Sequence, residues 1–121
     1  MSKRILIVDD SPSIRQMVEM TLKTASYDVT AAPDGQAAFE LCQKSQFDFV
    51  LTDQNMPRMD GITLIKSLRG LATFSKTPII VLTTEASDTL KMQGKAAGAT
   101  GWMVKPFDPK KLLDVVAKVL G

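Results

Sequence analysis

The chain has 121 residues, a size that fits one domain with a hydrophobic core of its own. Histidine is absent and cysteine occurs once, which excludes an internal disulfide, a Ser-His-Asp triad and a histidine-ligated metal. The net charge of +2 is too small to indicate nucleic-acid binding. Any chemistry therefore rests on carboxylates, hydroxyls, lysines or the backbone.

Apolar runs and amphipathic stretches alternate along the chain. The expected elements are a strand at 5–8, a helix from Pro12 capped by Ser11, a strand at 27–32, a helix after the turn at 33–35, a strand at 47–52, a loop at 55–60, a helix at 61–68, a strand at 78–83, a helix at 87–97, a strand at 101–104 and a last helix from Asp108 or Pro109.

This alternation predicts an α/β fold in which five βα units form one domain over residues 1–121. Five units are too few for a closed barrel, so we expect an open, doubly wound five-stranded parallel sheet with the flavodoxin-like order 2-1-3-4-5. The apolar run at 5–8 is too short for a signal peptide or a membrane helix. We therefore expect a cytoplasmic protein that does not contact membranes, and a monomer by default.

Polar residues follow four of the five expected strands. Ligands of such sheets bind at the carboxyl ends of the strands, and the first and third strands are neighbours. The order therefore brings Asp9, Asp10 and Asp53 together, with Thr83 and Lys105 beside them. Each residue taken singly is more often a turn, cap or surface residue, but the set is chemically coherent.

Three carboxylates in one small pocket must take up protons or share a cation. Because no histidine or second cysteine is present, an oxygen-preferring ion such as Mg²⁺ is the natural counter-charge. A carboxylate beside Mg²⁺ and a lysine can act as a nucleophile towards a phosphoryl group and form an aspartyl-phosphate. The sequence thus predicts phosphoryl chemistry at this edge of the sheet.

Four blocks of sequence, 7–10, 52–61, 82–84 and 104–107, resemble the signature blocks of response-regulator receiver domains in order and spacing, and the resemblance covers essentially the whole chain. It implies that Asp53 is the phosphoacceptor. It also implies a Mg²⁺ site formed by Asp9 (mainly through water), Asp10, Asp53 and the backbone carbonyl of Asn55.

The same resemblance assigns the switch hydroxyl to Thr83 and phosphate binding to Lys105. The peptide that joins Lys105 to Pro106 is commonly cis in the family. Trp102 takes the position of the aromatic switch residue, where Tyr or Phe is more usual, and plain packing is its alternative reading.

In such receivers, phosphorylation remodels the face made by the fourth helix, the fifth strand and the fifth helix. Several lysines lie near this face and either favour an acidic partner or form a solvated rim: Lys91, Lys95, Lys110, Lys111 and Lys118.

The last expected helix reaches Gly121, so the sequence suggests no output domain and predicts signalling by protein contact. The chain most resembles the single-domain chemotaxis receivers of the CheY type. Asn55 and Glu85 are the pair found in receivers of that type with short-lived phosphorylation, whereas Gln54 departs from the apolar residue that is more usual after the phosphoacceptor. The implied partners are a CheA-like histidine kinase, which supplies the phosphohistidine, and an output protein such as the flagellar motor switch or a phosphatase.

Three other hypotheses compete with a chemotaxis switch. A phosphorelay carrier or a phosphate sink would use the same residues without a motor target. A phosphohydrolase of the haloacid dehalogenase type would place a second Asp where Asn55 stands. An FMN carrier would have a Ser-, Thr- and Gly-rich loop after the first strand, where Asp9 and Asp10 would repel a bare phosphate. Only the phosphohydrolase would be an enzyme with turnover, so the sequence favours a protein that is not an enzyme beyond its own phosphorylation and dephosphorylation.

Overall fold

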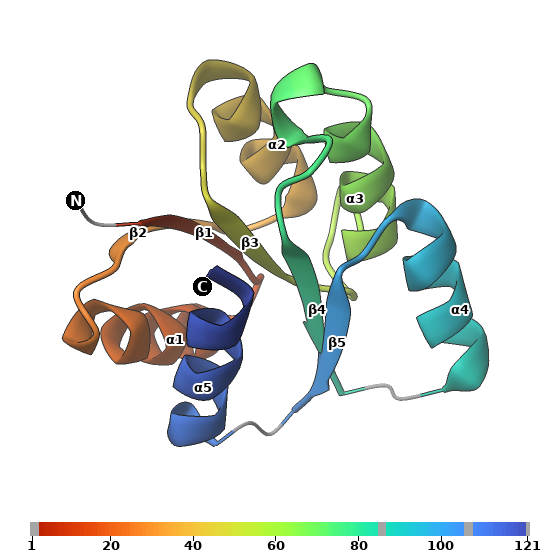
Figure 1. The fold of residues 1–121 in the computed structure, drawn as a ribbon. Coiled ribbons are helices and arrows are strands. Elements are labelled where there is room, and N and C mark those ends of the chain that lie inside the picture. Colours follow the sequence, from red (N-terminus) through yellow and green to blue (C-terminus); the bar gives the residue numbers. More distant parts are fainter. Residues whose placement is uncertain (1–2, 85–86, 106–107, 121) are drawn as a thin grey trace.

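The structure, a computed structural model, describes residues 3–84, 87–105 and 108–120. Its five strands form a single parallel sheet in the order β2-β1-β3-β4-β5 (Figure 1). The strands are β1 (Arg4–Val8), β2 (Asp28–Ala32), β3 (Phe49–Asp53), β4 (Ile79–Thr83) and β5 (Gly101–Val104). The α/β fold class and the strand order 2-1-3-4-5 are therefore confirmed.

Helices cover both faces of this sheet (Figure 1). One face packs against α1 (Pro12–Thr24) and α5 (Pro109–Leu120) through the apolar cluster that includes Val18, Leu22, Leu112 and Val116. The other face packs against α2 (Gly35–Lys44), α3 (Gly61–Arg69) and α4 (Asp88–Ala97). A sheet covered on both faces explains why β1, β3 and β4 are almost continuous apolar runs.

Side-chain caps fix where the helices begin. Ser11 accepts a hydrogen bond from the Ile14 N–H, and Pro12 occupies the first helical position, as the sequence predicts. Asp34 and Asp60 cap α2 and α3 in the same way. The helices α1 and α2 thus begin within four residues of the strand ends that precede them, whereas a longer loop separates β3 from α3.

The third strand lies later than predicted, at Phe49–Asp53 instead of 47–52. Asp48 is held outside the strand because its carboxylate accepts the Arg4 N–H at 2.8 Å. Phe47 is buried beneath the Arg4 guanidinium, whose central carbon lies 4.9 Å from the ring centre. At its other end the strand includes Asp53 as its last residue.

A short 3-10 helix, η1 (Ala72–Phe74), follows α3 and is absent from the sequence-based expectation. Phe74 from this turn is fully buried in the α2/α3/α4 side of the core. None of the helices in the described ranges combines the length and apolar composition needed to cross a bilayer.

Candidate functional site

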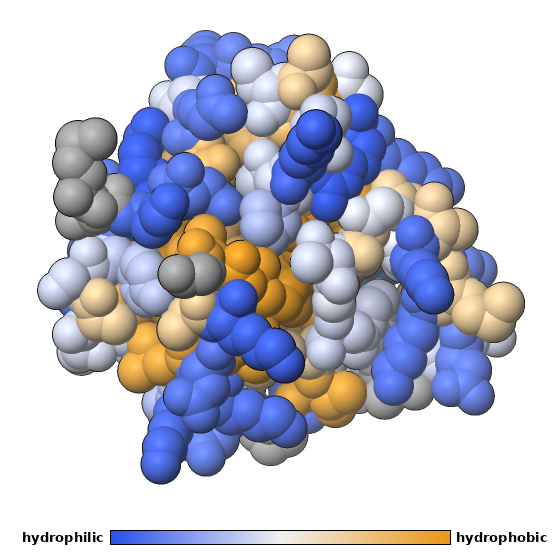
Figure 2. Space-filling view, in the orientation of Figure 1, coloured by the Kyte–Doolittle hydropathy of each residue, from blue (hydrophilic) through white to orange (hydrophobic). Residues whose placement is uncertain are grey.

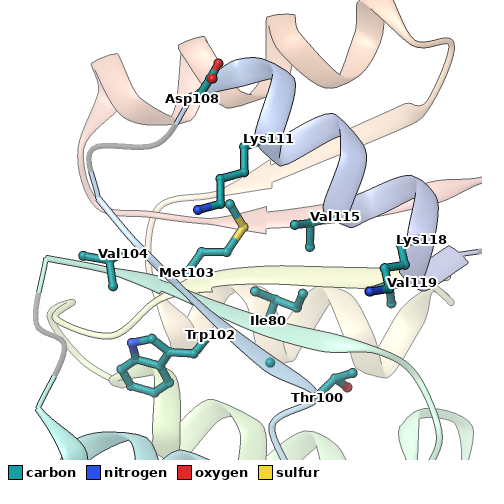
Figure 3. A pocket seen from close by; sticks show the side chains of 11 residues that line it. Ile80, Thr100, Trp102, Met103, Val104, Asp108, Lys111, Val115, Lys118 and Val119 are labelled. Carbon is teal, nitrogen blue, oxygen red and sulfur yellow. The ribbon is translucent and has the colours of Figure 1, made fainter.

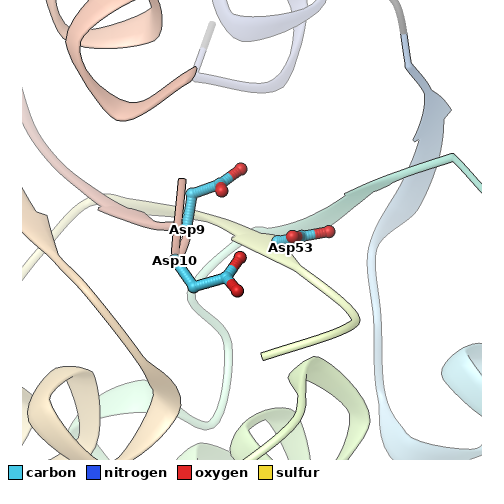
Figure 4. A group of neighbouring side chains, drawn as sticks. All are labelled: Asp9, Asp10 and Asp53. Atoms are coloured by element: carbon cyan, nitrogen blue, oxygen red, sulfur yellow. The ribbon is translucent and has the colours of Figure 1, made fainter. Parts of the chain in front are cut away.

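Three carboxylates meet at the carboxyl edge of the sheet. Asp9 and Asp10 follow β1, and Asp53 ends the neighbouring β3 (Figure 4). One oxygen from each of the three lies within 4.8 Å of the others. The strand order therefore brings together the three acids that the sequence singled out.

Lys105, which follows β5, completes the pocket from the other side. Its Nζ lies 2.9 Å from Asp9 Oδ2 and 3.4 Å from Asp53 Oδ2. The ammonium therefore touches two of the three carboxylates. Asp9 is 96 residues from Lys105 along the chain, so only the folded sheet creates this contact.

Asp9 is the anchored acid and Asp10 the exposed one. The Oδ1 atom of Asp9 accepts the Ser11 N–H at 2.9 Å, and its Oδ2 faces Lys105. Arg15 donates to the Asp9 carbonyl at 2.9 Å. Asp9 is 2% exposed, whereas Asp10 lies open to solvent. Asp10 is thus the acid with more freedom to bind an ion directly.

Asp53 lies in an environment of opposing electrostatic effects. It is 8% exposed, and burial raises the pKa of its carboxyl above the ordinary value. The Lys105 ammonium lowers this pKa, the Asp9 carboxylate raises it, and the Gln54 N–H, which donates to Asp53 Oδ1 at 2.8 Å, lowers it. The net direction of the pKa shift is upward because burial, its largest cause, outweighs the effect of Lys105.

This donor set fits Mg²⁺. Hard carboxylate oxygens of three acids converge, and the Lys105 ammonium contacts two of them, so a divalent cation would balance the remaining negative charge. Asn55, whose backbone carbonyl is a metal ligand by the family resemblance, lies two residues after Asp53 and is exposed.

Thr83 and Trp102 lie on the strands beside this pocket. Thr83 is fully buried at the end of β4, one residue after Leu82, which is the register partner of Asp53. Its carbonyl accepts the Lys105 N–H at 2.7 Å. Trp102 is half-buried in β5 and points to the opposite side of that strand from Met103 (Figure 3). Glu85, Pro106 and the peptide before Pro106 lie outside the described residues.

Two contacts of the loop that follows Asp53 were not predicted. Gln54 is buried and its side chain accepts a hydrogen bond from the Ile62 N–H. Arg58, with a φ of 69°, forms an ion pair with the buried Asp34 at 3.3 Å. One signal in the sequence did single out Gln54: it is polar at a position where the family resemblance expects an apolar residue. No signal in the sequence singled out Arg58, because its partner lies on another loop.

Comparison with known families gives a match to the response regulator receiver domain over residues 5–117. The chain belongs to the receiver domains of response regulators. Receiver domains take phosphoryl groups from histidine kinases, bind Mg²⁺ at an acidic pocket and pass the signal to output partners. The family that matches is therefore neither the phosphohydrolase family nor the FMN-carrier family considered above.

Solved structures similar to this receiver include the chemotaxis response regulator CheY4 of Vibrio cholerae. It is 48% identical, has a TM-score of 0.95, and the alignment covers 98% of this chain and 99% of that one. A receiver domain of a sensor histidine kinase from Pseudomonas aeruginosa is 27% identical with a TM-score of 0.93, over 100% and 99% of the two chains. That structure holds a magnesium ion coordinated in its active site cleft.

The receiver is also similar to the transcriptional regulatory protein SrrA of Staphylococcus aureus, at 38% identity over 113 residues. The alignment covers 93% of this chain and 46% of SrrA, so the chain spans about half the length of the curated relatives it matches.

Proposed function

We propose that this receiver is a phosphorylation switch that accepts a phosphoryl group on Asp53 from the phosphohistidine of a histidine kinase, in a Mg²⁺-dependent reaction. The observation that carries the proposal is the pocket itself: Asp53 lies within reach of two further carboxylates and 3.4 Å from the Lys105 ammonium. The chain has no histidine, so the phosphohistidine comes from a partner kinase unless a small phosphodonor replaces it.

In the transfer, an Asp53 carboxylate oxygen attacks the phosphorus, a P–O bond forms, and the P–N bond to the kinase imidazole breaks as that ring takes up a proton. Asp9, Asp10, Asp53 and the Asn55 carbonyl would hold Mg²⁺, which when bound supplies positive charge beside the phosphoryl oxygens. The Lys105 ammonium, already directed at Asp53 Oδ2, neutralises further charge on those oxygens.

Other residues act after the transfer. The Thr83 hydroxyl binds a phosphoryl oxygen and moves inward, and Trp102 follows as the aromatic switch. Asn55 and Glu85 set the lifetime of the phosphorylated residue, and Lys105–Pro106 is the candidate cis peptide. These roles follow the family pattern residue by residue and are supported by the position of Thr83 and Asn55 at the same sheet edge as Asp53.

The output surface in this proposal is the face of α4, β5 and α5. A groove of about 660 Å³ lies between β5 and α5 (Figure 3). Its floor is apolar and includes Ile80, Met103 and Val119, and Lys111 and Lys118 lie at its border. Figure 2 shows hydrophobic surface in this part of the molecule with hydrophilic residues around it. Such a surface suits an amphipathic partner.

We place the switch in chemotaxis because of its similarity to CheY4, with a CheA-like kinase as phosphodonor and the flagellar motor switch or a phosphatase as output partner. We further propose that residues 1–121 form one receiver domain, which acts as a cytoplasmic monomer. Because the chain is also similar to SrrA, a transcriptional regulatory protein, the identity of the output partner is the part of the proposal that the comparisons constrain least.

Mass spectrometry after incubation with Mg²⁺ and acetyl phosphate tests the assignment. The wild-type protein should gain the mass of one phosphoryl group, and EDTA should abolish the gain. The Asp53→Asn protein should gain none, whereas Asp28→Asn, at the opposite edge of the sheet, should react like the wild type. Equal labelling of Asp53→Asn would show that another residue is the acceptor.

The second candidate function is a phosphorelay carrier or a phosphate sink. Such a protein would compete for phosphoryl groups from a chemotaxis kinase but would not bind a motor-switch peptide in its phosphorylated form. A binding measurement with the beryllofluoride-activated protein separates the two candidates.

A further inference from the structure

Gln54 is a polar residue buried directly after the proposed phosphoacceptor. We propose that Gln54 is a positioning residue for the metal site: it joins the start of α3 to Asp53 and so fixes the loop that carries Asn55. The inference rests on the proposed function, because it concerns how firmly the Mg²⁺ ligands are held.

Three hydrogen bonds of Gln54 carry this inference. Its N–H donates to Asp53 Oδ1 at 2.8 Å. Its own carbonyl accepts the Gly61 N–H at 3.0 Å, and its side-chain Oε1 accepts the Ile62 N–H at 2.8 Å. Gln54 is 7% exposed, so these bonds are shielded from water. One residue therefore connects the Asp53 carboxylate to the first two amides of α3.

Close packing at the same point leaves little freedom. A Cβ atom on Gly61 would lie 2.5 Å from the Asp53 carbonyl oxygen and 3.0 Å from Gln54 Oε1, so only glycine lets α3 start this close to the end of β3. Because the contact is that close, a shift of the helix start must also shift the end of β3 or the loop between them.

The loop of residues 55–60 is held at two places. The Gln54 bonds to Gly61 and Ile62 close its base, and the ion pair between Arg58 and Asp34 holds its far side. Asn55 is the first residue after the base. Loss of the Gln54 Oε1 acceptor would leave the amide of the buried Ile62 without its partner, and the base of the loop would have to open to hydrate it.

The Asn55 carbonyl would then lose its fixed distance from Asp53. Mutations of groups that orient metal ligands weaken metal binding without removing any ligand. We therefore expect Gln54 to act on Mg²⁺ affinity as well as on stability.

Asp60 provides a matched control at the same helix end. Its Oδ1 accepts the Thr63 N–H at 2.8 Å, the same length as the Gln54 bond to Ile62. This bond lies on the exposed side of α3, and the Asp60 side chain has no described bond to Asp53. Asp60→Ala thus removes a cap of α3 and leaves the connection to Asp53 in place.

The test is isothermal titration of Mg²⁺ into the wild type, Gln54→Leu, Gln54→Met and Asp60→Ala, at a temperature well below all their thermal midpoints. Gln54→Met keeps the length of the side chain and serves where Gln54→Leu folds poorly. We expect the Kd for Mg²⁺ to rise about tenfold in the Gln54 variants and to stay unchanged in Asp60→Ala. All three variants should show a lower thermal midpoint in metal-free buffer.

Gln54 variants that bind Mg²⁺ as tightly as the wild type would overturn the inference, and so would an equal loss of affinity in Asp60→Ala, which would make Gln54 an ordinary helix cap. In either case, a wild type that binds Mg²⁺ and takes up phosphate from acetyl phosphate leaves the proposed function intact. A wild type that does neither overturns the proposed function and the inference with it.

Discussion

Asp53, the proposed phosphoacceptor, has a carboxylate whose two oxygens are both held at a fixed place. Its Oδ1 accepts the Gln54 N–H, and its Oδ2 faces the Lys105 ammonium. Burial and the nearby Asp9 carboxylate nevertheless keep the pKa of Asp53 raised. The carboxylate of Asp53 is therefore held in position, but its ionisation lowers the stability of the folded protein.

This conflict predicts a pH-dependent gain in stability for Asp53→Asn in metal-free buffer. Because the pKa of Asp53 is higher in the folded than in the unfolded chain, its favourable contribution is present in acid and is lost as the pH rises through the folded-state pKa. Asn does not ionise. We therefore expect Asp53→Asn to have the higher thermal midpoint at neutral pH, and the difference to shrink as the pH falls towards 3.8, the ordinary pKa of the group.

Thermal unfolding of both proteins across this pH range, with EDTA present, measures the effect. Asp28→Asn, an exposed change at the amino end of β2, is the control and should show no such trend. A constant difference between Asp53→Asn and the wild type at every pH would contradict the electrostatic explanation.

At the scale of the elements, Arg69 connects three segments. Arg69 is the last residue of α3, and its Nη1 donates to the carbonyls of Phe74 and Thr77, at 2.7 Å each. Its Nε and Nη2 donate to the Gly98 carbonyl at the end of α4, at 3.1 and 2.8 Å. Burial lowers the pKa of this guanidinium, which satisfies carbonyls that would otherwise be left at the ends of η1 and α4.

Arg69→Met should therefore lower the free energy of unfolding by about 3 kcal/mol, since it removes several hydrogen bonds from a charged donor. Lys66→Met, on an exposed position of the same helix, should change it by less than about 0.5 kcal/mol. Urea denaturation of the two variants measures the difference. Equal effects would mean that Arg69 contributes only its apolar stem.

The pairing of α4 with β5 depends on a small residue opposite a large one. A Cβ atom on Gly94 would lie 2.8 Å from Cζ3 and 3.4 Å from Cε3 of Trp102. Glycine in the middle of a helix is unfavourable by about 1 kcal/mol relative to alanine, so its presence here requires a compensating reason. The indole of Trp102, larger than the Tyr or Phe more usual in the family, provides it.

Gly94→Ala should push the indole away from α4 and towards solvent. Trp102 is the only tryptophan of the chain, so its fluorescence emission should shift to longer wavelength. The stability should gain less than the roughly 1 kcal/mol that helix propensity alone gives. Gly70→Ala, at the end of α3, is the control and should leave the spectrum unchanged. Unchanged emission of Gly94→Ala would mean that the ring has room already.

Most elements could be predicted from the sequence because buried parallel strands are apolar runs and because their carboxyl ends collect functional groups. The same rule brought Asp9, Asp53 and Lys105 together correctly. Gln54 stood out as a polar residue at its position, but the contacts of Gln54 and Arg69 could not be predicted, since their partners are backbone groups on other elements. Such contacts depend on how the helices pack, and no local pattern of residue types encodes them.

At the scale of the whole molecule, the acidic pocket exists only when the sheet is complete. Asp9 and Asp10 come from the end of β1, Asp53 from the end of β3, and Lys105 from the segment after β5. The unfolded chain separates these groups, so a Mg²⁺ ion that binds the pocket must stabilise the fold through mass action.

We accordingly expect Mg²⁺ at ten times its Kd to raise the free energy of unfolding by about 1.4 kcal/mol. Asp10→Asn should lose most of this gain because it removes the exposed carboxylate that we propose as a ligand, whereas Asp28→Asn should keep it because that residue lies at the opposite edge of the sheet. Urea denaturation with and without Mg²⁺, at constant ionic strength, measures all three proteins. If Mg²⁺ stabilised Asp10→Asn as much as the wild type, the ion would bind elsewhere on the surface, and the acidic pocket would not be the site that couples metal to folding.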